Sequence, residues 1–268
     1  MSPVRRADTD DPAVRAFVGL TDVAWRRSQE AANGLYIAEG AAVIERALAQ
    51  GHRLRTVLTS PRWLPTVADL LPISADVLLI ADSGIERITG FRVHRGALAA
   101  FERPTQPDLP TLATTARRLV ALEGLVDPTN VGAIARTALA LGCDGLVLDP
   151  RCGDPLYRRS VKVSMGAVLA LPHVRATRWP DDLEILRAAG HELVALTPRG
   201  TRVLADVAIP PGGRCTLLMG AEGPGLRAAT LARATQAVRI PMTAGVDSLN
   251  VAAAAAIACA HLSDVTES

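Results

Sequence analysis

Short apolar segments alternate with helical segments over the second half of the chain, and this alternation limits the possible folds more than any other feature. The apolar segments have the length of strands and end in polar or glycine-rich turns; they are residues 119–122, 145–148, 193–197, 215–219 and 237–240. Buried strands that take turns with helices indicate an α/β fold, a mostly parallel sheet with helices on both faces. Ligands of such sheets bind at the carboxyl ends of the strands, so site residues are expected in the turns that follow them.

The first part of the chain is predicted to form a smaller α/β domain of its own. Its expected elements are a helical stretch over residues 21–51, strands over 54–59 and 77–81, and a brief helix over 83–89 that begins after Asp82. Prolines then interrupt the pattern at positions 104, 107 and 110, among Thr, Gln and Asp. Because proline disfavours helices and central strands, an exposed connector is expected there. The predicted organisation is an N-terminal domain over residues 1–103, a linker over 104–115 and a C-terminal domain over 116–268.

The composition excludes several classes of protein. Hydrophobic residues make up 49% of the chain and aromatic residues 3%, which is typical of an ordered core of Ala, Val, Leu and Ile. The net charge of +2 argues against an extended surface that binds polyanions non-specifically. Any nucleic-acid-binding surface is therefore expected to be a local patch. The four cysteines and five histidines lack ligand spacing, so no metal is expected and the thiols are predicted to be buried and reduced. The longest apolar stretch, residues 251–262, is too short to span a bilayer, and we expect a cytoplasmic protein without a membrane partner.

Asn130 and Arg136 follow the first strand of the second half. Taken singly, Asn130 is explained as a helix cap and Arg136 as a solvated charge. Arg136 lies six residues after Asn130, close to two helical turns. If Asn130 begins the helix, both side chains are therefore expected near the same rim.

Two further turns carry polar residues. Gly220, Glu222 and two more glycines follow a strand, an arrangement that an ordinary strand-to-helix connection explains equally well. A carboxylate in this turn would repel a phosphate, so a neutral or cationic part of a ligand fits better. In the third turn Asp247 or Ser248 is expected to cap the last helix, which accounts for Ser248 but poorly for Asn250.

These three segments, in this order and at these separations, resemble the signature motifs of the SpoU/TrmH family of RNA 2′-O-methyltransferases in the SPOUT superfamily. The resemblance covers residues 119–262, and residues 37–40 and 91–97 resemble more loosely the family's ribosomal-protein-like RNA-binding domain. It implies S-adenosylmethionine as cofactor, bound in a bent form by the loops of a deep trefoil knot. It also implies a homodimer with its sites near the subunit interface. Neither the knot nor the dimer follows from periodicity, and knots are rare among folds.

The resemblance also assigns roles to residues. It places Leu196, Thr197, Gly220, Ile240, Met242, Ser248 and Leu249 around the cofactor, and Asn130, Arg136, Glu222 and Asn250 at the reaction centre. An arginine is a poor base at neutral pH, so we expect Arg136 to anchor a phosphate and stabilise the developing alkoxide. Glu222 either accepts the hydroxyl proton or orients Asn130, in which case water or a phosphate oxygen accepts the proton.

RNA contacts are expected from arginines in both domains, although most of these are as well explained as solvated surface charges. The candidates are Arg26, Arg27, Arg53, Arg55, Arg92, Arg95, Arg158 and Arg159. The N-terminal domain resembles those of the family's rRNA-directed members, and this resemblance implies ribosomal RNA rather than transfer RNA as the substrate. Two other classes of function remain open: a nicotinamide-dependent oxidoreductase, which the late glycine-rich turn without G-x-G-x-x-G disfavours, and a catalytically silent RNA-binding protein of the same fold.

Overall fold

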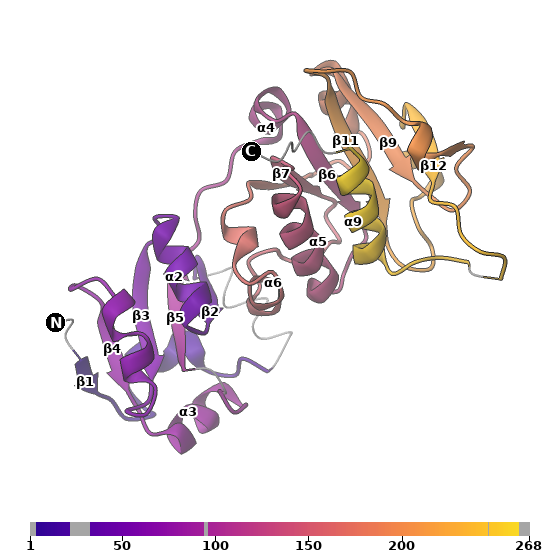
Figure 1. The fold of residues 1–268 in the computed structure, drawn as a ribbon. Helices are drawn as coiled ribbons and strands as arrows, with labels where there is room; N and C mark the ends of the chain where they lie inside the picture. Colours follow the sequence, from indigo (N-terminus) through magenta and orange to yellow (C-terminus); the bar gives the residue numbers. More distant parts are fainter. Residues whose placement is uncertain (1–3, 22–32, 94–95, 246, 263–268) are drawn as a thin grey trace. The chain divides into compact units, whose positions relative to one another are not determined.

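The computed structural model describes residues 4–21, 33–93, 96–245 and 247–262. Contacts within the chain divide it into two compact units, Met1–Thr105 with Leu156–Leu169, and Gln106–Pro155 with Ala170–Ser268 (Figure 1). The first boundary lies close to the expected one. The inclusion of Leu156–Leu169 in the first unit was not expected; it follows from ion pairs of Arg158 and Lys162 with the buried Glu39.

The secondary structure alternates in both units. The strands are β1 Val4–Arg6, β2 Leu35–Glu39, β3 Leu54–Thr59, β4 Asp76–Leu79, β5 Ala97–Glu102, β6 Arg118–Glu123, β7 Gly145–Leu148, β8 His173–Arg175, β9 His191–Leu196, β10 Arg202–Val203, β11 Arg214–Gly220 and β12 Gln236–Arg239. The helices are α2 Ala41–Ala49, α3 Asp82–Thr89, α4 Leu109–Thr115, α5 Pro128–Ala140, α6 Arg158–Val163, α7 Leu183–Ala188, α8 Ala228–Leu231 and α9 Val251–Leu262. Short 3-10 helices are η1 Pro12–Phe17, η2 Leu64–Thr66, η3 Ala68–Leu70, η4 Ala167–Leu169 and η5 Leu204–Asp206.

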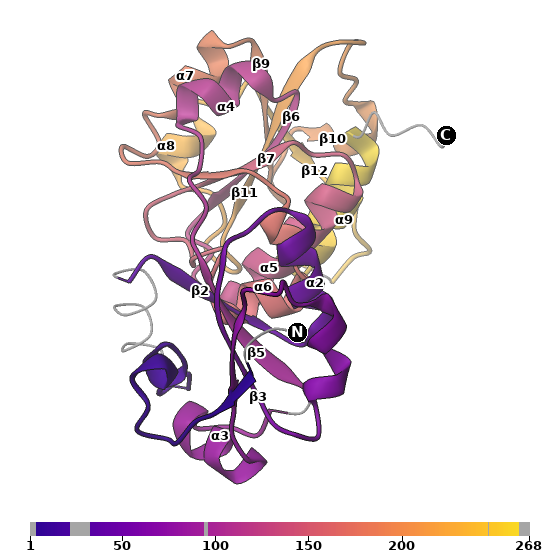
Figure 2. The same cartoon turned by 90° about the vertical axis from the view of Figure 1, so that its left-hand side faces the viewer.

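The first unit is built on a mixed sheet. Among the described residues its strands lie in the order β1-β4-β3-β5-β2, with β5 antiparallel to both of its neighbours. Phe17 of η1 and Ile85 of α3 pack with Leu58 into the core on one side of this sheet. Helix α2 contacts β2, and Figure 2 shows it on the other side of the sheet from α3.

The predicted helix over residues 21–51 is wrong for residues 35–39 and confirmed for residues 41–49. Residues Leu35–Glu39 form a strand, and Ile37 pairs with Ala100 of β5. Gly40 has φ 92°, which interrupts any helix, and α2 begins only at Ala41. The strands at 54–59 and 77–81 and the helix after Asp82 are confirmed, except that Asp82 is the first residue of α3 rather than its cap.

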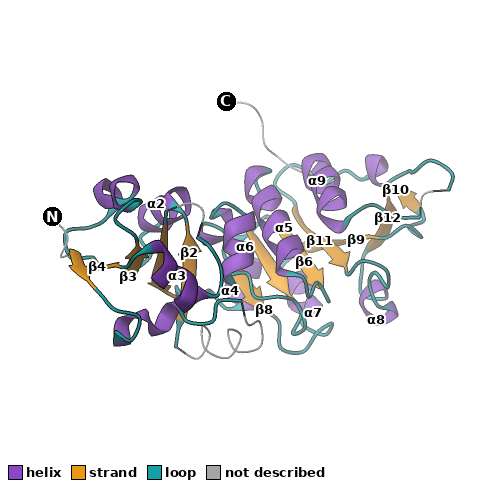
Figure 3. Ribbon diagram, turned by 90° about the horizontal axis from the view of Figure 1, so that it is seen from below, coloured by secondary structure: helices purple, strands orange, loops and turns teal. Residues whose placement is uncertain are grey.

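The second unit contains a parallel sheet, as expected. Its described strands lie in the order β10-β12-β9-β11-β6-β7-β8 and every neighbouring pair is parallel. All five strands that the sequence predicts are present; β8 and β10, which have three and two residues, are too short to show a pattern. Helices α5 and α9 pack together on one face, whereas α7 and α8 lie on the other (Figure 3).

The predicted connector over residues 104–115 is wrong for its second half. Residues Leu109–Thr115 form α4, whose Leu109 and Leu112 pack into the core beside α7. Asp108 caps this helix by accepting a hydrogen bond from Thr111 N at 2.8 Å. Pro110 stands in the first turn, where a missing N–H removes no helical hydrogen bond.

In the part of the chain that the structure describes, no helix combines the length and the apolar character needed to cross a membrane.

Candidate functional site

A pocket of about 330 Å³ lies where β9, β11 and β12 end. Since these strands are parallel, their carboxyl ends meet at one edge of the sheet, and the loops that follow them form the walls. The structure brings together all seven residues that the sequence analysis places around a cofactor. Leu196, Thr197, Gly220, Ile240, Met242, Ser248 and Leu249 all line this pocket.

Gly220 allows the turn after β11 to fold tightly. A Cβ atom at this position would lie 2.1 Å from the carbonyl carbon of Gly225. The close approach goes with a single bridge between Ala221 and Gly225, whose N–H donates to Ala221 O at 2.9 Å. Gly223 and Gly225 have φ angles of 82° and 67°, which other residues rarely adopt. The turn thus brings backbone to the pocket wall and holds Glu222 at its rim.

The pocket has negative electrostatic character. Glu222 and Asp247 are the charged residues among its described lining, and none of that lining is Lys, Arg or His. Apolar side chains such as Met219 and Leu226 form much of the remaining wall. Two carboxylates disfavour a ligand phosphate and favour a ligand that carries a positive charge beside an apolar part.

Glu222 connects the three turns that the sequence analysis singles out. Its Oε1 atom accepts hydrogen bonds from Asn250 Nδ2 at 2.7 Å and from Asn130 Nδ2 at 3.3 Å. The backbone N–H of Val251 lies at 3.5 Å from the same oxygen. Residues that are far apart in the sequence therefore meet at one carboxylate.

Asn250, and neither Asp247 nor Ser248, caps α9. Its Oδ1 accepts hydrogen bonds from Ala252 N at 3.0 Å and Ala253 N at 3.3 Å. The expectation that Asp247 or Ser248 caps this helix is therefore wrong. Because the carbonyl oxygen of Asn250 binds the helix, its amide nitrogen points to Glu222. A single asparagine thus joins the helix start to the pocket rim.

Asn130 lies inside α5, not at its cap. Asp127 is the cap and accepts from Thr129 N at 2.8 Å, so the side chain of Asn130 is available to Glu222. Arg136 is exposed, and its side chain forms no hydrogen bond or ion pair with a described residue. Six residues amount to about 9 Å of rise and a rotation that leaves Arg136 about 120° from the direction of Asn130. No hydrogen bond or ion pair links the Arg136 side chain to the described residues Asn130, Glu222 and Asn250, so the place of Arg136 at the reaction centre stays a prediction.

The expected RNA-binding arginines differ in their surroundings, and Arg26, Arg27 and Arg95 lie outside the described residues. Arg53 and Arg55 are exposed and form ion pairs with Glu102. Arg92 is exposed beside a hollow that also contains Trp63.

Arg158 and Arg159 line a pocket of about 860 Å³ in the first unit. Arg158 is mostly buried, pairs with Glu39 and lies 4.3 Å from the ring centroid of Phe91. Its ion pair and its aromatic contact already occupy this guanidinium, whereas Arg159 is exposed.

Several residues of the site escaped the sequence analysis. Met219 and Leu226 line the pocket but look in the sequence like ordinary core residues. Asp247 also lines it, and its place next to Ser248 was a usable signal. Glu123 was missed as well, although a carboxylate that ends a buried strand is unusual enough to note.

Comparison with known proteins identifies the family. Residues 117–260 match the SpoU rRNA Methylase family. An uncharacterized tRNA/rRNA methyltransferase of Mycobacterium bovis is 40% identical over 254 residues, 94% of this chain and 88% of that protein. A 23S rRNA (guanosine-2'-O-)-methyltransferase, RlmB, of Burkholderia sp is 32% identical over 193 residues, 70% of this chain and 77% of that protein. The crystal structure of an AdoMet-bound rRNA methyltransferase from Sinorhizobium meliloti superimposes with a TM-score of 0.83 at 28% identity, covering 96% of this chain and 97% of that one. The chain belongs to the SpoU rRNA methylase family.

Proposed function

We propose that this protein transfers a methyl group from S-adenosylmethionine to a ribose 2′-hydroxyl of ribosomal RNA. The observation that carries the proposal is the convergence of Asn130 and Asn250 on Glu222, at the rim of an apolar pocket with negative charge. The Burkholderia and Sinorhizobium relatives, which are named as rRNA methyltransferases, support ribosomal over transfer RNA. A nicotinamide dinucleotide suits the pocket poorly, because its two phosphates would face Glu222 and Asp247.

The pocket residues fit S-adenosylmethionine. Leu196, Ile240 and Met242 offer apolar surface for an adenine ring, and Gly220 lets the backbone approach closely. Glu222 and Asp247 favour the positive charges of the amino group and the sulfonium. When bound, the cofactor supplies an electrophilic methyl group.

The side chains of the Asn130–Glu222–Asn250 cluster are assigned different roles toward the ribose. Glu222 Oε1 is held by the two asparagine amides, whereas Oε2 has no hydrogen-bond partner among the described residues. We assign to Oε2 the acceptance of the proton of the 2′-hydroxyl, while Asn130 and Asn250 keep the carboxylate in one orientation. Arg136 carries an exposed positive charge, which suits an anchor for an RNA phosphate rather than a base.

The finer features of the fold belong to the same proposal. After β12 the chain returns to place α9 against α5 and β11, a path that supports the deep trefoil knot of the SPOUT superfamily. Helix α9 is apolar all round and leaves Ile257 44% exposed, which supports a homodimer that covers it. The exposed arginines Arg53, Arg55 and Arg92 support a ribosomal-protein-like RNA-binding role for the first unit. The cytoplasm, where ribosomal RNA resides, is the compartment we propose.

Two measurements test the function. The purified protein is incubated with ribosomal RNA, in separate reactions with transfer RNA, and with S-adenosylmethionine labelled in its methyl group. We expect label in ribosomal RNA, and label only in transfer RNA would overturn the substrate. Thermal unfolding is then followed with S-adenosylhomocysteine and with NAD. We expect only the former to raise the melting temperature, and binding without any transfer would identify a silent RNA-binding protein.

A further inference from the structure

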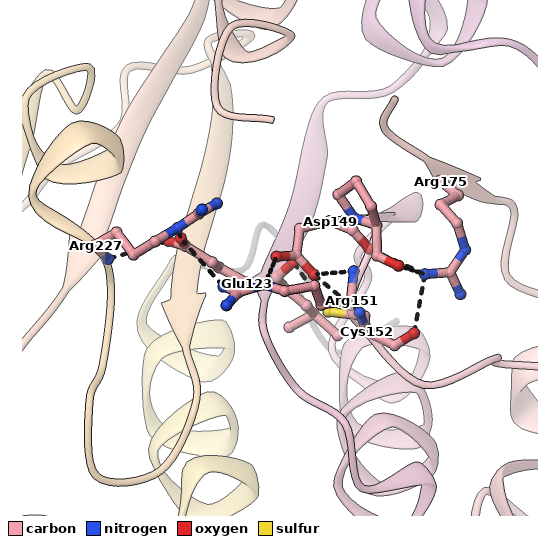
Figure 4. A network of polar contacts seen from close by, with 8 residues as sticks. Glu123, Asp149, Arg151, Cys152, Arg175 and Arg227 are labelled. Carbon is pink, nitrogen blue, oxygen red and sulfur yellow. Dashed lines mark hydrogen bonds and ion pairs between the residues drawn. The ribbon is translucent and has the colours of Figure 1, made fainter. Parts of the chain in front are cut away.

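Three arginines and two buried carboxylates form a network at the carboxyl ends of β6, β7 and β8. Figure 4 shows Arg227, Arg151 and Arg175 in a row, with Glu123 and Asp149 between them. Both carboxylate side chains are at most 1% exposed. The arginines, in contrast, are exposed residues. The arginine residues of the network are therefore exposed to solvent, whereas the carboxylates are buried.

Asp149 fixes the position of Arg151, the middle member of the row Arg227–Arg151–Arg175. It accepts hydrogen bonds from Arg151 N at 3.0 Å, Cys152 N at 2.9 Å and Arg151 Nε at 3.3 Å. Burial by itself would raise the pKa of Asp149, but these bonds and one from the backbone of Gly124 outweigh it and hold the pKa below its ordinary value. Asp149 is thus a stable anion that fixes the direction of the Arg151 side chain.

At the other end of the row, Glu123, the last residue of β6, binds Arg227, which follows the glycine-rich turn. Its Oε1 pairs with Arg227 Nε, and its Oε2 accepts from Arg227 N at 3.3 Å. Arg151 Nη2 lies 3.9 Å from the same carboxylate. Arg227 directly follows Leu226, which lines the cofactor pocket, so this ion pair links the row to the pocket wall.

Arg175 has no acidic partner among the described residues. Its Nη1 donates to the carbonyl oxygens of Asp149 at 3.0 Å and Cys152 at 2.9 Å. Neutral carbonyls orient the guanidinium without cancelling its charge. Three guanidinium groups over two carboxylates leave the row with an excess of positive charge.

The row lies beside the proposed reaction centre. A Cβ atom on Gly124 would lie 3.2 Å from Arg151 Nη2 and 3.7 Å from Ala221 Cβ. Ala221 is the residue before Glu222, so Arg151 and the Glu222 turn flank the same backbone position. Oriented guanidinium groups with an excess of positive charge are suited to binding phosphate.

We propose that Arg151 and Arg175 bind RNA backbone phosphates next to the ribose that is methylated, and that Glu123 and Asp149 are positioning residues for the row. This inference rests on the proposed function, because it concerns the same substrate. The reaction centre around Glu222 contacts only the ribose, and the proposal adds a neighbouring subsite for phosphate that consists of Arg151 and Arg175. The row would align the RNA strand with Glu222 without reading its bases.

The test uses the full chain with Arg151→Gln, Arg175→Gln and the double variant. Loss of the Arg151 side chain leaves Asp149 with its backbone donors, so folding is expected to persist. Loss of the Arg175 guanidinium frees backbone carbonyls of residues 149–153, so the melting temperature of the Arg175 variants is measured alongside binding. Affinity for a fluorescent single-stranded RNA oligonucleotide is measured by anisotropy at several salt concentrations, and kcat and KM are measured with ribosomal RNA. We expect each substitution to weaken RNA binding and raise KM about tenfold, and to lower the salt slope of binding by about 0.7. The affinity for S-adenosylhomocysteine should stay unchanged.

Two controls separate binding from structure. Arg187→Gln removes an exposed arginine near the amino end of β9, away from the row, and should alter nothing. Arg151→Lys retains the charge and should recover most of the salt slope. Unchanged affinity, KM and salt slope in the double variant would overturn the proposal. If the wild-type protein transferred no methyl group, the proposed function would fail, while the oligonucleotide measurement would still decide whether the row binds phosphate.

Discussion

Replacing Glu222 by glutamine removes a charge from the pocket and keeps the size of the side chain. In the native protein Oε1 of Glu222 accepts from Asn250 Nδ2 at 2.7 Å and from Asn130 Nδ2 at 3.3 Å. The amide oxygen of glutamine can still accept these bonds, but its NH₂ group donates and takes no proton. The variant therefore tests the charge and the proton acceptor while it disturbs the shape of the cluster little.

The size of the charge effect follows from the position of Glu222 at an exposed rim. A ligand charge about 6 Å from a carboxylate interacts with it by about 0.7 kcal/mol in water and by about 2.8 kcal/mol at an effective dielectric constant of about 20. Because Glu222 is exposed, we expect a value near the lower limit, about 1 kcal/mol. S-adenosylmethionine has a sulfonium where S-adenosylhomocysteine has a neutral sulfur. The preference for the first ligand over the second should therefore fall about fivefold.

The assay is calorimetric titration of both ligands into the wild type, Glu222→Gln and Glu184→Gln. Glu184 is an exposed carboxylate on α7 and serves as the matched control. Methyl transfer should fall at least about 100-fold in Glu222→Gln, because the ribose hydroxyl loses its proton acceptor. An unchanged ratio of the two affinities, or an equal change in Glu184→Gln, would refute the electrostatic reasoning; normal methyl transfer would refute the role of Oε2.

Three further predictions concern other parts of the protein. Asn250→Ala removes the cap of α9, so it should lower the unfolding free energy by about 1 kcal/mol and should also lose methyl transfer; unchanged stability in chemical unfolding would contradict the role of Asn250 as cap. Arg136→Ala should retain calorimetric binding of S-adenosylhomocysteine and lose methyl transfer, and normal turnover would remove its role as anchor. Burial lowers the pKa of His191, whose Nε2 donates to Ala113 O and whose Nδ1 accepts from Thr216. Between about pH 6.5 and the lower pKa of His191 in the folded protein, the unfolded chain therefore binds more protons than the folded one. The free energy of unfolding should fall on acidification in this window. Chemical unfolding at several pH values should show a smaller fall in this free energy for His191→Gln than for the wild type.

Much of the second unit can be predicted from the sequence, because its strands are buried on both faces and appear as continuous apolar runs. The strands β6, β7, β9, β11 and β12 are found this way. Shorter strands carry no such signal. The strand β2 was mistaken for a helix because the spacing of its apolar residues continues across Gly40 into α2, and only the backbone shows that Gly40 separates them.

The site was predictable where motif residues point directly into a pocket. Ser248 and Leu249 follow from the motif, whereas the role of Asn250 as a cap depends on which of its two amide atoms faces the helix. For Arg136 the condition on which the prediction rests is not met, since α5 begins at Pro128 and not at Asn130, and its role stays a prediction. The pairing of Glu123 with Arg227 joins the end of β6 to the residue before α8, which is distant in sequence, and it has no local signal.

The position of the transferred methyl group tests the central claim most directly. Ribosomal RNA is methylated with S-adenosylmethionine labelled in its methyl group, digested to nucleosides and analysed by mass spectrometry. We predict that the label is found in 2′-O-methylnucleosides and is lost with Glu222→Gln. Label on a base, or label on the ribose that persists in that variant, would contradict the assignment of the pocket and of Glu222.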